Sequence, residues 1–151
     1  MQDITKQVLY NYCQDYLKVR LEAVQDRLKD IQDSLASETK SSVGDKYETG
    51  RAMLHLEKEK QMTQLSTLIA SKKILSNVCP TTKFETVQSG ALVTTSKGCF
   101  YIAISAGKMV LKEKVVFVIT LSSPIGNILF NKKKGDSFNF RGKTYTILEI
   151  V

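Results

Sequence analysis

The sequence predicts an α+β protein in which an antiparallel two-helix coiled coil precedes a small, mostly antiparallel sheet domain with one short helix. Apolar residues repeat with helical spacing in the first half of the chain. Short runs rich in valine, isoleucine, threonine and aromatic residues, bounded by glycine turns, fill the second half. Pro80 cannot continue a helix and separates the two patterns. We therefore expect two domains, residues 1–78 and 79–151.

The first helical segment carries a heptad seam. Its apolar residues lie three or four positions apart, at Leu17, Leu21, Val24, Leu28, Ile31 and Leu35. Polar residues occupy the rest of the helix surface, so one narrow apolar stripe needs one partner helix. A helix of about 33 residues is roughly 50 Å long, too long to be covered by a small globular core.

A second helical segment is expected from about Asp45 to Leu75, after a polar break at residues 36–43. Its apolar stripe is weaker and consists of Met53 or Leu54, Met62, Leu65, Leu68 with Ile69, and Leu75. A short connector between two helices predicts antiparallel neighbours. His55 is the single histidine and has no cysteine near it in the sequence, which favours an exposed helical residue over a metal ligand.

The second half predicts a small sheet domain. The strand-like runs lie at residues 91–95, 99–104, 115–120, 137–140 and 144–151. Between them, Ser123 stands in the position of a helix cap and Pro124 in the first helical position, which predicts a short helix packed on one face of the sheet.

Composition narrows the class of protein. The chain has 151 residues, of which 42% are hydrophobic and 25% charged, a globular profile. No apolar run approaches the roughly 20 residues that a bilayer requires, and the start lacks a signal-peptide pattern, so we expect a cytoplasmic protein with no membrane partner. Cys13, Cys79 and Cys99 are widely spaced without a CxxC pair, which predicts free thiols.

The positive charge is concentrated in the second half. Residues 1–78 carry 12 Lys+Arg against 11 Asp+Glu, whereas residues 79–151 carry 10 against 4. A basic surface favours nucleic acid or an acidic protein as partner. Lysines on strand edges that discourage edge-to-edge pairing explain the same charge equally well.

Three motifs in the second half carry a family resemblance. They are Ser123-Pro124-Ile125-Gly126, then Lys132 to Asp136 with its Gly-Asp pair, and the closing run Tyr145 to Ile150. With the order of hairpin, linker and sheet domain, they resemble the Gre family of bacterial transcript-cleavage factors, most specifically over residues 115–150.

The resemblance is looser in the hairpin. Gly44-Asp45-x-x-Glu48 follows the family's Gly-Asp-x-x-Glu-Asn tip. Thr49 replaces the asparagine, and Gly50-Arg51 replaces the family's small and acidic residues. The architecture of the family covers the whole chain, but its catalytic pattern is matched only in part.

The resemblance implies an FKBP-like C-terminal domain that docks on the rim of the secondary channel of bacterial RNA polymerase, while the coiled coil reaches the active site. Asp45 and Glu48 would help hold the second magnesium ion there, so that the polymerase cuts backtracked RNA and the nascent RNA 3′ end is met indirectly. Carboxylates are suitable magnesium ligands, and residues at i and i+3 of a helix share one side. The magnesium would be supplied in the polymerase, with none bound by the chain alone, which would stimulate cleavage without being an enzyme.

The resemblance also implies contact surfaces. Ser122, Ser123, Pro124, Ile125 and Gly126 would form part of the docking surface, although the family often has an acid where Ser122 stands, and a plain helix N-terminus is the alternative. Lys40, Lys46 and Arg51 surround the two acids and are candidates to touch RNA phosphates. The lysines at 132–134 would meet the polymerase or RNA, or form a solvated turn.

Other interpretations remain open. Asp45 and Glu48 also have the spacing of a capping box at a helix start. The partial tip fits a secondary-channel regulator without cleavage activity. A peptidyl-prolyl isomerase is a third possibility from the FKBP-like fold, against which the absence of tryptophan weighs. The fourth is a coiled-coil dimerisation module, whereas the hairpin interpretation predicts a monomer.

Overall fold

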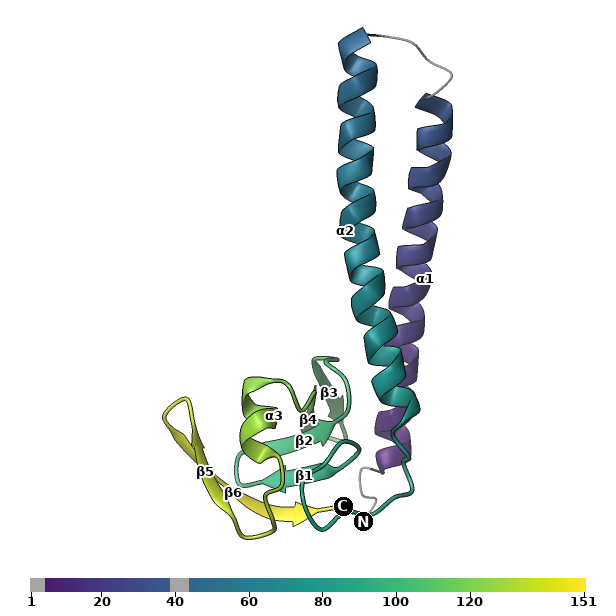
Figure 1. The fold of residues 1–151 in the computed structure, drawn as a ribbon. Helices are drawn as coiled ribbons and strands as arrows, with labels where there is room; N and C mark the ends of the chain where they lie inside the picture. Colours follow the sequence, from purple (N-terminus) through teal and green to yellow (C-terminus); the bar gives the residue numbers. More distant parts are fainter. Residues whose placement is uncertain (1–4, 39–43) are drawn as a thin grey trace. The chain divides into compact units, whose positions relative to one another are not determined.

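The computed structural model describes residues 5–38 and 44–151 and confirms the predicted α+β class (Figure 1). Two helices, α1 (Lys6–Glu38) and α2 (Gly44–Ser76), precede a six-stranded sheet and a short helix, α3 (Pro124–Leu129). The chain separates into two compact units, Leu17–Lys72 and the combination of Met1–Tyr16 with Lys73–Val151. We call them the hairpin unit and the sheet unit. Both long helices contribute to both units, whereas the sequence prediction assigned them to one domain ending at residue 78.

The hairpin unit is an antiparallel pair of helices. Arg51, early in α2, donates from Nη1 to the carbonyl oxygen of Leu35, late in α1, at 3.1 Å. Further along, Arg27 Nε and Glu57 Oε1 lie 3.3 Å apart. In the part of the chain that the structure describes, no helix has the length and apolarity to cross a membrane.

The seam predicted on α1 is confirmed. Leu17, Val24, Ile31 and Leu35 are buried, and Leu21 and Leu28 are half-buried. Because these residues recur at heptad spacing, they stay on the side of α1 that faces α2.

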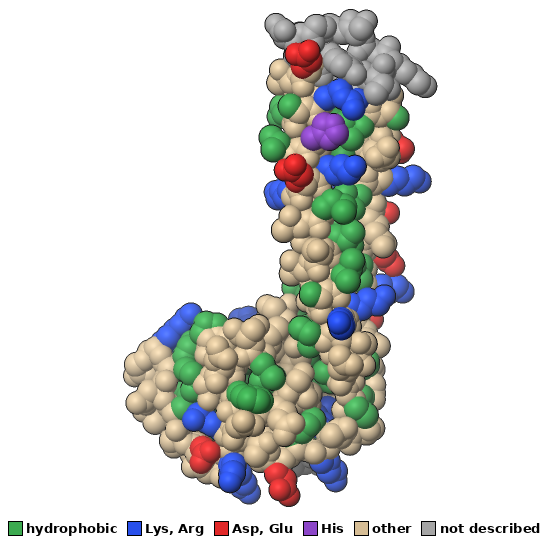
Figure 2. All heavy atoms as spheres, viewed as in Figure 1, with side chains coloured by type: hydrophobic (Ala, Val, Ile, Leu, Met, Phe, Trp, Pro, Cys, Tyr) green, Lys and Arg blue, Asp and Glu red, His purple; other side chains and the backbone are tan. Residues whose placement is uncertain are grey.

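The stripe predicted on α2 is only partly right. Leu54, Leu65 and Leu68 are half-buried and Leu75 is buried, but Met53, Met62 and Ile69 are exposed. Hydrophobic side chains are accordingly visible on the outside of the hairpin in Figure 2.

Polar side chains take the missing places at the helix interface. Glu57, Lys58 and Gln61 are half-buried. Glu57 accepts hydrogen bonds from Gln61 at 3.1 Å and from Arg27 at 3.3 Å. The bond from Gln61, followed by that from Arg27, lowers the pKa of the Glu57 carboxyl. A hydrogen-bonded carboxylate can stay near the seam, which explains why an apolar stripe did not predict this segment.

The sheet has the strand order β3-β4-β2-β1-β6-β5. Only β2 and β4 pair in parallel, and every other neighbouring pair is antiparallel, as the sequence predicted in the main. The strands are β1 (Leu92–Thr95), β2 (Gly98–Ile102), β3 (Lys108–Leu111), β4 (Lys114–Ile119), β5 (Ser137–Phe140) and β6 (Lys143–Ile150).

Strand β3 was absent from the sequence prediction. Its four residues alternate between exposed and half-buried positions. The turn that joins it to β4 consists of Lys112 and Glu113, both with positive φ (49° and 67°). Glycine and asparagine favour such a two-residue hairpin, so Lys-Glu gives no turn pattern to recognise. Arg141 and Gly142 (φ 52° and 78°) form the equivalent turn between β5 and β6, and there the glycine made the hairpin predictable.

Both faces of the sheet are covered within the sheet unit. One face and α3 enclose a core that includes Val93, Phe100, Ile102, Leu129 and Ile147. The opposite face carries Tyr101, Val116 and Val118, all buried, and the Tyr12 hydroxyl of α1 donates to the carbonyl oxygen of Ala106 at 2.9 Å. These contacts place the first turns of α1 with the sheet.

Candidate functional site

The two predicted acids lie at the start of α2. The helix begins at Gly44, so Asp45 is its second residue and Glu48 its fifth. Their i, i+3 spacing puts them on one side of the helix, and the Glu48 side chain is exposed. The Asp45 side chain lies outside the described residues, so the capping-box interpretation stays a prediction.

The chemistry of this pair fits part of a magnesium site. Mg²⁺ prefers octahedral oxygen coordination and is commonly held by one or two protein carboxylates with water and substrate oxygens. Asp45 and Glu48 supply two such groups. Among the side chains that the structure describes, which do not include that of Asp45, no group of three or more His, Cys, Asp or Glu residues is placed to hold a metal ion.

The structure describes only one side chain of the three basic residues that were predicted to touch RNA near the acids. Arg51 is half-buried, and its guanidinium binds the Leu35 carbonyl oxygen near the end of α1. That bond joins the two helices and satisfies a carbonyl in the last helical turns, where such groups lack intrahelical partners. Lys40 lies outside the described residues, and for Lys46 the structure describes the helical backbone. Both stay predictions as RNA contacts.

The segment predicted to dock a partner forms the N-terminus of α3. Ser123 caps the helix, since its Oγ accepts from the Gly126 N–H at 3.1 Å and donates to the Thr120 carbonyl oxygen at 2.7 Å. A Cβ at position 126 would lie 2.1 Å from the same Thr120 oxygen, so glycine is required there. Ser123 and Gly126 therefore hold the shape of this turn.

The other three residues of that segment differ in exposure. Ile125 is buried in the core between α3 and the sheet. Ser122 and Pro124 are exposed, and the Ser122 hydroxyl lies 2.9 Å from that of Thr120. Any partner that docks here would meet Ser122 and Pro124 first, and their positions depend on the bonds of Ser123.

The lysine-rich turn and the histidine have structural explanations. Asp136 Oδ2 accepts from the Lys133 backbone N–H at 2.8 Å, and Gly135 has φ 93°, so the Gly-Asp pair closes the turn after the lysines. Lys133 and Lys134 are exposed. His55 is an exposed helical residue, as expected.

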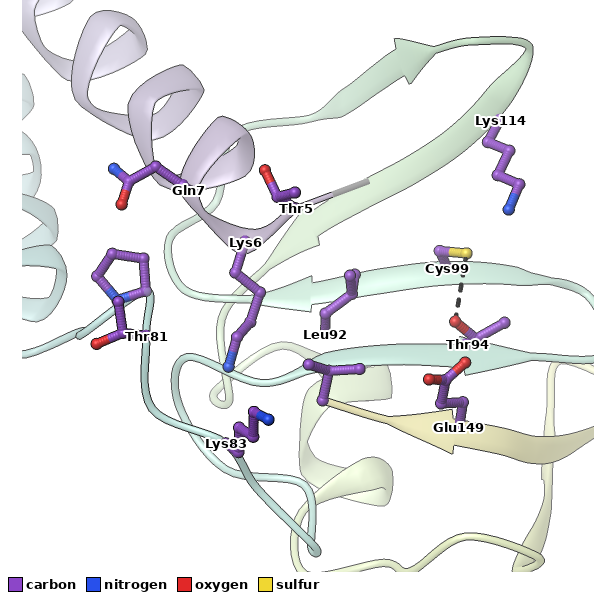
Figure 3. Close-up of a pocket in the computed structure, with 12 residues that line it drawn as sticks. Thr5, Lys6, Gln7, Thr81, Lys83, Leu92, Thr94, Cys99, Lys114 and Glu149 are labelled. Carbon is purple, nitrogen blue, oxygen red and sulfur yellow. Dashed lines mark hydrogen bonds between the residues drawn. The ribbon is translucent and has the colours of Figure 1, made fainter. Parts of the chain in front are cut away.

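A pocket of about 620 Å³, which the sequence did not indicate, lies beside the start of α1 (Figure 3). Lys6, Lys83, Lys114 and Glu149 are among the residues that line it. Lys6 is only 6% exposed, donates to the Thr82 carbonyl oxygen, and has its Nζ 5.0 Å from the centre of the Phe84 ring. Burial lowers the pKa of Lys6, and the charge of Lys83 adds to this effect. These contacts give Lys6 a structural role, because they join α1 to the segment after Pro80.

No protein-family model matches this chain, and none of the curated proteins matches it. Among solved structures, a structure of the transcription factor Gfh1 is similar to this chain with a TM-score of 0.36 and 19% sequence identity, covering 90% of this chain and 91% of that one.

Proposed function

We propose that this chain is a transcription elongation factor of the Gre type, which binds bacterial RNA polymerase and stimulates its cleavage of backtracked RNA. The proposal is carried by the i, i+3 spacing of Asp45 and Glu48 within the first turns of α2, because residues at that spacing share one side of a helix. Two of the three motifs support it, since Ser123 and Gly126 of the first and Asp136 of the second have defined roles in turns. Such a factor would act in the cytoplasm as a monomer.

The hairpin suits insertion into a narrow channel. Within the hairpin unit α1 runs from Leu17 to Glu38, which is 22 residues or about 33 Å at ~1.5 Å per residue, and α2 runs from Gly44 to Lys72. The buried seam on α1 and the bond from Arg51 to Leu35 hold the two helices together up to the end where the acids lie. A paired helix is stiffer than a loop, so it can present a carboxylate at a fixed place in a partner.

The two acids would supply carboxylate oxygens to a magnesium ion shared with the polymerase. When bound, a second magnesium ion stabilises the attacking and leaving oxygens of a phosphodiester displacement. Glu48 is exposed and free to turn toward such a site. The remaining ligands and the RNA would belong to the polymerase, so this chain would not catalyse the reaction alone.

Docking and contact with the RNA near the polymerase active site would use different residues. Ser122 and Pro124, held by the capped turn at Ser123, would meet the rim of the polymerase channel. Lys40 and Lys46 would attract RNA phosphates by charge. Arg51 would act mainly through its bond to the Leu35 carbonyl oxygen, which holds the end of the hairpin together.

A second candidate is a regulator that occupies the same channel without stimulating cleavage. Thr49, Gly50 and Arg51 favour it, because they replace the asparagine and the small and acidic residues that follow the acids in the Gre pattern. Occupying the channel requires the hairpin and the docking surface, but not the complete tip.

The test uses RNA polymerase halted in a backtracked state on transcripts labelled at the 3′ end. Addition of the chain should release short labelled fragments faster than the polymerase does alone. Binding without faster release would support the second candidate. No binding to the polymerase at low micromolar concentration would overturn both.

A further inference from the structure

The sheet unit has a groove of about 530 Å³ whose lining combines aromatic and basic side chains. It lies where the face of the sheet covered by α3 opens to solvent, and Pro124 and Ile125 of α3 contribute to its lining. Figure 1 shows α3 over this face with the β5–β6 hairpin beside it. The aromatic residues of the groove are Phe100, Phe117, Phe140 and Tyr145, and the basic residues are Lys97, Arg141 and Lys143. We call it the aromatic–basic groove.

The aromatic rings of the groove form stacked platforms. The rings of Phe100 and Phe117 lie 5.7 Å apart between centroids, with an angle of 28° between their planes. Phe100 is buried and fixed in the core, whereas Phe117 is 38% exposed. Nearby, the ring of Tyr145 lies 6.3 Å from that of Phe100. Phe117 therefore presents a flat apolar surface to solvent while its partner holds it in place.

A second flat group lies at the turn of the β5–β6 hairpin. The guanidinium carbon of Arg141 is 5.0 Å from the centre of the Phe140 ring. Arginine over an aromatic ring is held by a cation–π contact, and a guanidinium plane can itself stack on a base. The positive φ of Arg141 and Gly142 fixes the turn that brings this pair beside the groove.

The charges of the groove have one sign. Lys97, Arg141 and Lys143 are exposed, and none of the described residues that line the groove is acidic. These charges favour an anionic occupant, and it gains most if it also has flat aromatic groups that stack on Phe117. Single-stranded nucleic acid has both features, since every base has an aromatic face and every linkage a phosphate. An acidic peptide matches the charge but has few flat groups to place on the exposed ring.

We propose that the aromatic–basic groove binds single-stranded nucleic acid, with a base stacked on Phe117 and phosphates near Lys97, Arg141 and Lys143. The volume of the groove suits one or two nucleotides, so the contact adds affinity without reading sequence. The proposal goes beyond the elongation-factor function and does not rest on it, because binding of a free oligonucleotide needs no polymerase.

The experiment measures binding of fluorescent eight-residue oligouridine and oligothymidine to the full chain over a range of salt concentrations. Binding should weaken as salt rises, because phosphate contacts release counterions. Phe117→Leu keeps an apolar side chain but removes the ring, and it should weaken binding about tenfold. Phe130→Leu is the matched control, because Phe130 is 47% exposed and lies outside the groove. It should change binding less than about twofold.

A pair of double variants tests the charges. Lys97→Gln with Lys143→Gln should lower the slope of log affinity against log salt by about 1.4, since each phosphate contact on a single strand contributes about 0.7. Lys72→Gln with Lys73→Gln changes the net charge equally at exposed positions outside the groove and should leave the slope nearly unchanged. Circular dichroism of each variant confirms that the fold is retained.

Three results would overturn the proposal. The first is no binding of either oligonucleotide at 50 mM salt, and the second is equal loss of binding in the Phe117 and Phe130 variants. The third is binding of a peptide of alternating glutamate and leucine in the groove when the oligonucleotides do not bind. That result would assign the groove to an acidic protein. Stronger binding of oligouridine than oligothymidine supports an RNA ligand, and the reverse supports DNA.

Discussion

The three cysteines have different surroundings, and two of them differ strongly in acidity. Cys13, a residue of α1, is buried, and burial raises the pKa of its thiol to about 12. Cys79 is exposed just before Pro80, with its Sγ 3.0 Å from the Thr81 hydroxyl. Hydrogen bonding by Thr81 and then Thr82 lowers the pKa of Cys79 to about 7. The thiolate is the reactive form, so the two positions should react at very different rates.

We expect iodoacetamide to modify Cys79 with a rate that rises as the pH passes through about 7, because the thiolate fraction grows there. Cys13 should stay unmodified until the protein is unfolded with denaturant. Mass spectrometry of peptides after short labelling at pH 6, 7 and 8 checks both statements. Thr81→Val should shift the Cys79 profile to higher pH, and rapid labelling of Cys13 in the folded protein would contradict the structure.

The sequence predicted some helices and strands better than others. Heptad spacing predicted the buried seam of α1, because apolar residues that repeat with this spacing all lie on the side of the helix that faces its partner. It failed on α2, where Glu57 and Gln61 hydrogen-bond to each other near the interface and apolar residues face solvent. The sequence prediction also missed strand β3, because the Lys112-Glu113 turn lacks the residues that favour positive φ. The pattern of apolar residues predicts an element that buries one apolar face. It fails where hydrogen-bonded polar side chains occupy part of that face.

The seam of the hairpin can be tested by truncation. Ile31 is buried with 1% exposure, so Ile31→Ala should lower the free energy of unfolding by about 2–5 kcal/mol through lost contacts and a cavity. Gln32→Ala changes the neighbouring exposed residue and should alter it by less than about 0.5 kcal/mol. Urea unfolding followed by circular dichroism at 222 nm measures both. Equal effects would show that Ile31 does not face α2.

The start of α3 can be tested in the same way. Ser123→Ala removes the cap and should cost about 1 kcal/mol of stability. Gly126→Ala should cost more, because its Cβ would collide with the Thr120 carbonyl oxygen. Asn127→Ala, at an exposed position of the same helix, is the control. Thermal unfolding of the three variants gives the order, and a Gly126 variant as stable as the Asn127 variant would contradict the close approach.

The order of a helical half followed by a sheet-forming half could be predicted from the sequence, because long amphipathic segments and short strand-like runs occupy separate halves of the chain. The positions of the acids and of the capped turn were also visible, since each is a local pattern of four residues. The aromatic–basic groove was not. Phe100 lies on β2, Phe117 on β4 and Tyr145 on β6, and only the strand order brings their rings together. Local spacing predicts what one helix presents, but not what distant strands assemble.

The proposed function depends on the two carboxylates at the start of α2 acting inside RNA polymerase. The deciding measurement is the release of 3′-labelled fragments from backtracked complexes by Asp45→Ala combined with Glu48→Ala, with polymerase affinity measured on the same samples. We predict at least a tenfold loss of release at roughly unchanged affinity, since metal ligands are lost while the docking surface is kept. Glu59→Ala, an exposed acid elsewhere on α2, should behave as the unmodified chain. Undiminished fragment release by the paired variant would contradict the account.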